Sequence, residues 1–239
     1  MSAMAHRRRA AAHGLDAGAL RAEQRRFREI FPRRFADPTY LEWERAYKVE
    51  AHRLWHELLS ASEMDRLLAA GDHREIAARA LAVYQRPKLN LLALYEWMGL
   101  REALVSRDGA RAFAPALREL IYGDGPYLPR FEAFVDTLDG LPQRQTRIAK
   151  WPVATLYPFV ALSASHLVVK PNLMKRAAAK LGADLRYRTR PNGETYAAVI
   201  AFARGVREGL AAWHPRDMID VQGFLWVTNS DEYADWPWE

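Results

Sequence analysis

The stretch TYLEWERAYKVEAHRLWHELL, residues 39–59, decides the class of fold. Its large apolar residues follow one another at spacings of three, four, seven and four: Tyr40, Trp43, Tyr47, Leu54 and Leu58. An α-helix returns to the same face every three to four residues. The stretch therefore predicts one long helix that packs against the protein through a single face.

The rest of the first half of the chain continues this pattern. A second stripe contains Leu89, Ala93, Trp97, Leu100 and Leu104, which predicts another helix with Trp97 in the core. The other segments with helical spacing are 62–70, 73–85, 108–122 and 128–139. Gly71-Asp72 separates the first two of them. Residues 15–141 are therefore predicted to form an N-terminal helical array.

The pattern of residue types changes after Gly140-Leu141-Pro142. Residues 153–162 are rich in β-branched and aromatic side chains and contain Pro158, and 166–170 and 185–189 are short runs of similar character. These residue types favour strands, and a strand that contains proline belongs at a sheet edge. Helices are predicted for 172–181, 193–213 and 215–228. The predicted fold is thus α+β and predominantly helical, with a C-terminal part, 142–239, of a small antiparallel sheet plus three helices.

The positive charge is concentrated at the N-terminus. Nine arginines and three acidic residues in 1–34 give a surplus equal to the net charge of +6 of the whole chain. We expect residues 1–14 to form a flexible basic arm, because they contain no apolar stripe. A second basic region, 144–190, has ten Lys and Arg residues against Asp184 alone.

The composition excludes several classes of protein. The chain has no cysteine, so it has no disulfide, thiolate metal site or cysteine nucleophile, and we expect a reducing cytoplasm as its compartment. The longest apolar run is too short to span a bilayer, so no membrane partner is predicted. No P-loop, dinucleotide fingerprint, zinc motif or nucleophile elbow is present. Whether the protein is an enzyme stays open, and no cofactor is predicted.

Two similar phrases, Lys170-Pro171-Asn172 and Arg190-Pro191-Asn192, each place a cation and an asparagine before a predicted helix. Helix capping by the asparagines alone would explain both phrases. Alternatively, the cations and the positive helix ends hold a phosphate or carboxylate. The candidate anion site consists of His166, Lys170, Tyr187 and Arg190.

Asp217 and Asp220 also allow two interpretations, one structural and one as metal ligands. Pro215-Arg216-Asp217 is a good helix start, which makes Asp217 a capping residue. The spacing of three also puts both carboxylates on one helix face, where they are candidates for binding a divalent metal. Two ligands do not make a site, so a third would have to come from His166 or His214.

These phrases resemble those of a group of bacterial proteins whose activity has not been established. The shared order includes Phe-Pro-x-x-Phe-x-x-Pro-x-Tyr at 31–40, Glu-Arg-x-Tyr-Lys at 44–48 and Asn-Leu-Leu at 90–92. Similar chains read His-x-Phe-x-Lys-Pro where this chain has Val168. The resemblance implies one continuous architectural unit over 27–233 and carries over no activity.

Three function hypotheses follow. The first is a protein that binds nucleic acid or another polyanion, with 144–190 as its basic surface and the N-terminal arm as an electrostatic supplement. The second is an interaction subunit that docks on a protein partner through a tryptophan-rich surface. The third is a metal-dependent phosphohydrolase or nuclease-like enzyme, in which Asp217 and Asp220 hold the metal while Lys170 and Arg190 take the phosphate.

Overall fold

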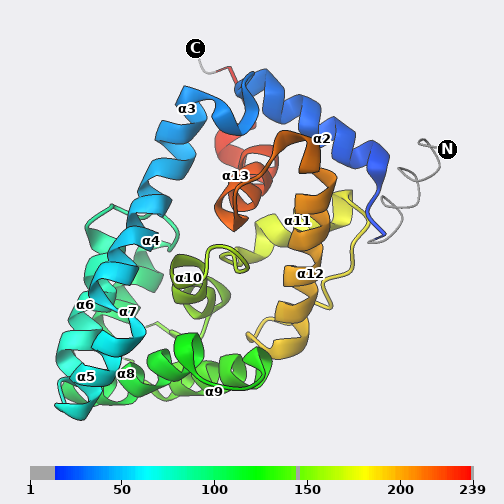
Figure 1. The fold of residues 1–239 in the computed structure, drawn as a ribbon. Helices are drawn as coiled ribbons and strands as arrows, with labels where there is room; N and C mark the ends of the chain where they lie inside the picture. The colour runs from blue at the N-terminus through cyan, green and yellow to red at the C-terminus, as the bar shows by residue number, and fades with distance from the viewer. Residues whose placement is uncertain (1–13, 144–145, 238–239) are drawn as a thin grey trace. The chain divides into compact units, whose positions relative to one another are not determined.

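A computed structural model describes residues 14–143 and 146–237. In these residues every regular element is a helix and no strand is formed (Figure 1). The chain divides into two compact units. Unit 1 comprises Met1–Ala46, Val169–Tyr187 and Glu194–Glu239, and unit 2 comprises Tyr47–Val168 and Arg188–Gly193. The predicted arm, 1–14, lies outside the described residues except for Gly14.

Unit 1 is built from segments that are far apart in the sequence. Its α-helices are α2 (Ala17–Ile30), α3 (Pro38–Tyr40), α11 (Pro171–Lys180), α12 (Gly193–Gly209, whose first residue belongs to unit 2) and α13 (Met218–Asn229). Its shorter helical turns are η2 (Arg34–Ala36), η3 (Leu41–Arg45), η4 (Ala211–Trp213) and η5 (Asp231–Tyr233). Helix α13 packs against both α2 and α11.

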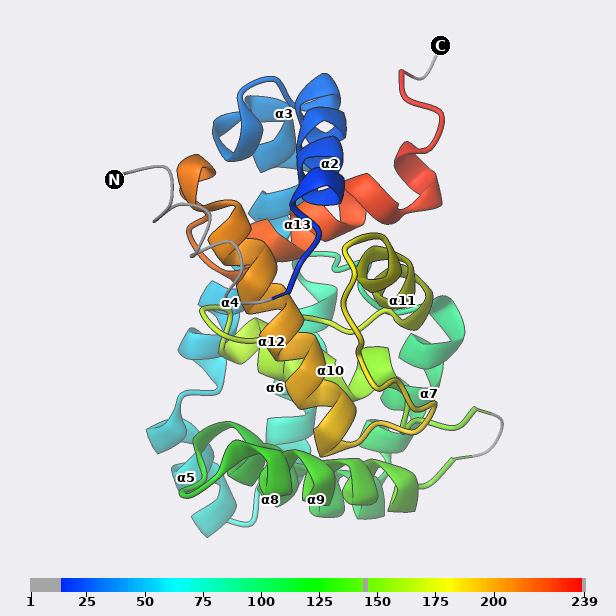
Figure 2. The same ribbon diagram turned by 90° about the vertical axis from the view of Figure 1, so that its right-hand side faces the viewer.

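Unit 2 is a helical array. Its helices are α4 (Ala46–Leu58, whose first residue belongs to unit 1), α5 (Ala61–Ala69), α6 (His73–Gln85), α7 (Leu94–Val105), α8 (Arg107–Tyr122), α9 (Tyr127–Gly140) and α10 (Trp151–Ala161). Helix α8 packs against α6 and α9, and α8 and α9 lie side by side in Figures 1 and 2. The predicted helical array is therefore present.

The predicted antiparallel sheet is wrong. Residues 151–161 form α10, and all eleven of its residues are buried. A helix enclosed on every side has no polar face, so its sequence shows no helical period and cannot be told from a buried strand by its pattern. Strand propensity describes side chains that fit a half-buried pleated surface, and tertiary burial overrode it here. Pro152 lies in the first turn, where a helix tolerates proline well.

The other two predicted strands are irregular chain. At 185–189 the backbone of Arg186 has a φ of 46°, a left-handed conformation that no strand contains. Side chains satisfy the carbonyl groups that a neighbouring strand would have bonded. The Thr195 hydroxyl donates to the Arg186 carbonyl at 2.8 Å, and the Trp151 indole donates to that of Arg188 at 2.8 Å. Residues 166–170 likewise pair with no strand in the described chain.

Trp97 departs from its predicted place in the core. Helix α7 begins at Leu94, so the apolar stripe that starts at Leu89 does not run along a single helix. Trp97 is half-buried, and its ring stacks on Tyr84 with the centroids 4.5 Å apart. The fully buried aromatic core of unit 2 lies elsewhere, and it includes Trp55, Phe113, Phe131, Phe134, Trp151 and Tyr157.

Two histidines of α4 bind the C-terminal end of α10. His52 Nδ1 lies 2.7 Å from the Val160 carbonyl oxygen, and His56 hydrogen-bonds to the backbone of Ala161. The two imidazole rings are 4.5 Å apart. Desolvation by neighbouring side chains lowers the pKa of His56, and the adjacent His52 lowers it further, while the bond to Ala161 opposes both.

We predict that unit 2 loses stability when the solution is acidified below about pH 6.5, the ordinary pKa of histidine. Because the pKa of His56 is lowered by folding, its contribution is complete above that pH and is lost as the pH falls through the lowered pKa. Thermal melts of wild type and His56→Gln across this range should show a smaller acid-dependent decrease in Tm for the variant. Part of His56 is solvent-exposed, so we expect a small difference.

No helix of the described chain has both the length and the apolar character needed to cross a membrane.

Candidate functional site

The four residues of the predicted anion site are divided between the units. Lys170 and Tyr187 belong to unit 1, whereas His166 and Arg190 belong to unit 2. Each engages a neighbour in its own unit. Lys170 Nζ lies 4.5 Å from the centroid of the Trp226 ring, and Lys175 Nζ lies 5.0 Å from the centroid of the Tyr187 ring.

The two residues in unit 2 are engaged in the same way. The His166 ring contacts the Tyr127 ring with the centroids 4.4 Å apart. Arg190 forms ion pairs with Asp136 at 2.6 Å and with Asp139 at 2.9 Å. The predicted anion site stays a prediction.

Most other cations of 144–190 also have partners in their own unit. Arg147 pairs with Asp139, Arg176 with Asp231, Lys180 with Glu23 and Arg186 with Glu194, and Lys150 lies over the Tyr95 ring. A guanidinium or ammonium group that already faces a carboxylate must give up that partner to bind a phosphate. At least five of the ten cations of this segment therefore already face a carboxylate of the protein.

Asp217 and Asp220 bind arginine side chains. Asp217 caps α13 by accepting from the backbone amides of Ile219 and Asp220, as the helix-start pattern predicts. It also forms a bidentate pair with Arg45, at 2.8 and 2.7 Å. Burial alone would raise the pKa of the Asp217 carboxyl, but Arg45 and the capped amides hold that pKa below its ordinary value.

Asp220 is completely buried, and both of its oxygens are fully used. Oδ1 accepts from the Tyr40 hydroxyl at 2.9 Å, from Arg45 at 3.0 Å and from Arg216 at 3.2 Å. Oδ2 accepts from the backbone amide and the Nε of Arg216, each at 2.9 Å. Burial and the Asp220 charge raise the pKa of Tyr40, which keeps its hydroxyl protonated as a donor. The Asp220 carboxylate therefore has a structural role.

Gly223 makes room for this cluster on α13. A Cβ at this position would lie 2.7 Å from the Tyr40 hydroxyl oxygen, closer than two such atoms can approach. Glycine therefore lets the Tyr40 ring lie against the helix and reach Asp220, one turn earlier. Among the described residues, no group of three or more His, Asp and Glu side chains could hold a metal ion.

The same cluster fixes the connection between α2 and α3. Arg216, which binds Asp220, also donates from Nη2 to the Phe35 carbonyl at 2.6 Å. The Asp37 carboxylate accepts from the Arg33 amide at 3.2 Å and from the Thr39 amide at 3.0 Å, and so caps α3. Residues 33–37 are thereby held in one conformation by side chains from both ends.

A hollow of about 280 Å³ lies between this connection and the turn at the end of η4, within unit 1. We call it the Arg–Trp pocket, and it is lined by Pro32, Arg33, Arg34, Phe35, Ala36, Ala212, Trp213 and His214. Two arginines and a histidine lie around it, and none of the described residues that line it is acidic. It therefore suits a small anionic group.

The backbone of the pocket is strained at two positions. Arg34 has a φ of 57° and His214 a φ of 53°, and both values are left-handed. Residues other than glycine seldom adopt this conformation, and such strain is often found at binding sites. The contacts of Phe35 and Asp37 described above hold Arg34 in this conformation.

Trp213 is the aromatic wall of the pocket. Its ring is half-buried and packs against Phe27, Phe35 and Phe224 at centroid distances of 5.8, 6.0 and 6.1 Å. The Arg34 guanidinium carbon lies over the ring, 5.5 Å from its centroid. Because three core aromatic rings fix the indole, the pocket presents a rigid aromatic surface beside a cation.

An exposed row of arginines leads along α2 toward the pocket. The buried side of α2 carries Leu20, Phe27 and Ile30, while Arg21, Arg25 and Arg28 are exposed on its outer side. We call these three residues the arginine face. None of them forms an ion pair with another described residue, and the same is true of the exposed Arg33 at the pocket. In the described part of unit 1, four exposed arginines without an ion pair therefore lie on α2 and directly after it.

The sequence pattern points to only part of this site. The arginine-rich segment 1–34 contains the arginine face and one wall of the pocket. Trp213 and His214 lie about 180 residues further along the chain, and the sequence suggests His214 only as a metal ligand. The one local signal was a tryptophan and a histidine directly before the Pro215 helix start.

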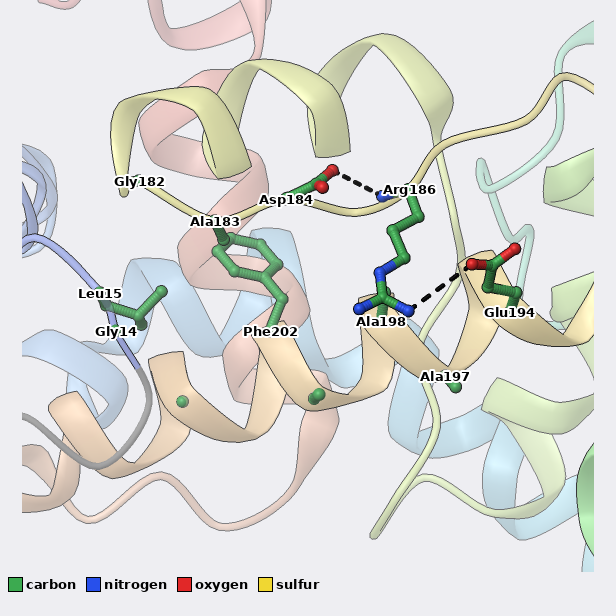
Figure 3. A pocket seen from close by; sticks show the side chains of 12 residues that line it. Gly14, Leu15, Gly182, Ala183, Asp184, Arg186, Glu194, Ala197, Ala198 and Phe202 are labelled. Atoms are coloured by element: carbon green, nitrogen blue, oxygen red, sulfur yellow. Dashed lines mark hydrogen bonds and ion pairs between the residues drawn. The ribbon is translucent and has the colours of Figure 1, made fainter.

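A second hollow in unit 1, of about 530 Å³, offers less specific chemistry (Figure 3). Its wall on α12 consists largely of small residues, including Ala197, Ala198 and Ala201. Its charged groups satisfy one another. The Arg186 amide donates to Asp184 at 2.8 Å, and the Arg186 guanidinium pairs with Glu194 at 3.6 Å.

The exposed apolar side chains gather on α7 of unit 2. Leu94, Met98 and Val105 are 74, 61 and 65% exposed, and their spacing puts them on one side of the helix. Trp55 and Trp151 are buried, and Trp43 is 41% exposed. The interaction hypothesis stays a prediction.

We predict opposite results for one substitution at two buried tyrosines. Tyr40→Phe removes a donor to a buried carboxylate and should lower the free energy of unfolding by about 1.5–3 kcal/mol. Tyr157→Phe should leave it unchanged or raise it, because the buried Tyr157 hydroxyl has no hydrogen-bond partner in the described chain. Urea unfolding of both variants beside wild type measures the difference. Equal losses of stability in the two variants would contradict the assigned role of the Tyr40 hydroxyl.

Comparison with known protein families, with curated proteins and with solved structures gives no significant match.

Proposed function

We propose that this protein binds nucleic acid or a related polyanion through unit 1, using the arginine face of α2 and the Arg–Trp pocket. One observation supports this proposal above the others. Arg25, Arg28 and Arg33 are exposed and form no ion pair with a described residue, whereas most cations of 144–190 face carboxylates or aromatic rings. The binding surface is thus proposed at α2 in place of 144–190.

Unpaired arginines are suited to phosphate for two reasons. Each cation that neutralises a phosphate releases condensed counterions, which favours binding at low salt. The guanidinium group also offers several donors in a plane that matches the oxygens of a phosphate. Arg25, Arg28 and Arg33 have no ion pair to break first, so both contributions are available to a ligand.

The length of the arginine face fits several phosphates. Helix geometry gives about 1.5 Å of rise per residue, so Arg21 and Arg28 are about 10 Å apart along α2. One strand of a duplex carries about three phosphates over that axial length. Arg33 and Arg34 continue the positive surface beyond the end of the helix. The expected contacts are to the phosphate backbone of the nucleic acid, so this surface should bind without strong sequence preference.

We predict that Arg25→Gln/Arg28→Gln weakens binding of a fluorescein-labelled oligonucleotide, measured by fluorescence anisotropy at several salt concentrations. The slope of log affinity against log salt should fall by about 0.7 to 0.9 for each phosphate that the variant no longer neutralises. Stability should change little, because both side chains are solvated.

Arg53→Gln/Arg66→Gln is the matched control. It removes the same charge from two exposed arginines that already pair with glutamates. Its affinity and salt slope should stay close to those of wild type. The same decrease in both double variants would show that net charge alone drives binding, and no binding by wild type would refute the proposal.

A further inference from the structure

We propose that the Arg–Trp pocket receives one unpaired nucleotide, with its base against Trp213 and its phosphate at Arg33 and Arg34. This inference rests on the proposed function and adds a preference for single-stranded over double-stranded nucleic acid. Three features of this pocket support the inference: an aromatic wall held in place, cations next to it and a small volume.

The volume restricts what can enter. About 280 Å³ is just below the range of about 300–1,000 Å³ that is typical of small-molecule sites. The hollow can take a single base with its phosphate, but no stretch of double helix. A base in a duplex would have to leave its stack and its partner first, whereas an unpaired base enters without that cost. The size of the hollow therefore discriminates between the two forms of nucleic acid.

The chemistry of the wall matches a base and a phosphate together. Aromatic side chains next to cations are how proteins bind single strands, since every base offers a flat face and every nucleotide a charge. Trp213 is held by Phe27, Phe35 and Phe224, so its ring needs no ordering when a base arrives. Arg34 lies over the same ring, so a base that stacks there takes the place of its guanidinium, which can then donate to the phosphate of the same nucleotide.

The left-handed residue in the wall allows a clean test. Arg34→Gly removes the guanidinium at a φ of 57°, where glycine is free of strain, so the fold should be kept or stabilised. Lys88→Gly is the matched control, because Lys88 is an exposed cation of unit 2 with a φ of 55°. Trp213→Leu removes the aromatic surface, and Trp43→Leu removes a partly exposed tryptophan of unit 1 that does not line the pocket.

The experiment compares fluorescein-labelled single-stranded and duplex DNA of one sequence by anisotropy. Wild type should bind the single strand on the order of 10-fold more tightly than the duplex, as expected for one stacked base. Arg34→Gly and Trp213→Leu should each lower single-strand affinity on the order of 10-fold and change duplex affinity far less. Lys88→Gly and Trp43→Leu should leave both affinities unchanged. Thermal melts check that each variant is folded.

Three outcomes would overturn the inference. Equal affinity of wild type for both forms is the first, and an equal decrease for both forms in Trp213→Leu is the second. The third is full competition by inorganic phosphate at the concentration of oligonucleotide phosphate, which would make the pocket a simple anion site. If these occur while Arg25→Gln/Arg28→Gln still weakens binding, the proposed function stands and only the nucleotide pocket fails. If neither form binds wild type, the proposed function itself fails.

Discussion

The arrangement of unit 1 depends on the buried carboxylate of Asp220. A charge this deep in a protein is tolerated only when its oxygens are hydrogen-bonded and its charge is balanced. Here two guanidinium groups, a phenol and a backbone amide surround it. The donors come from α3, from η3 directly after it and from Arg216 just before α13, so one carboxylate joins two segments that are distant in sequence. Removing it would leave Arg45 with Asp217 alone and deprive Tyr40 of its acceptor.

The exposed site is an extension of this buried network. Arg216 connects Asp220 to the Phe35 carbonyl, and Phe35 packs against Trp213, so the polar cluster and the aromatic core meet at the wall of the pocket. A binding surface gains from such preorganisation, because less conformational freedom is lost when a ligand arrives. The arginine face shares the same support, since Phe27 packs from the inner side of α2 against Tyr40 and Trp213.

Helix periodicity predicts a helix best where one face is exposed to solvent and the other is buried. The segments 73–85 and 108–122 are α6 and α8 almost to the residue, because their apolar residues line one side. The signal failed where a helix was buried on all sides, as in α10, and where backbone hydrogen bonds end on side chains, as at Arg186 and Arg188. The pocket could be predicted only in part, because Arg33 and Arg34 meet Trp213 through tertiary packing that no local pattern encodes.

The complete burial of α10 has a consequence for how unit 2 opens. A helix that loses its last turns to fraying needs solvent on at least one side, and α10 has none. Its amide hydrogens can meet water only after the surrounding helices have separated, so they should report the global opening of unit 2. Helix α7, with its outer side in solvent, belongs to the opposite end of the exchange hierarchy. Helix α10, whose sequence resembles an edge strand, should thus be the last part of unit 2 to exchange its amide hydrogens for deuterium.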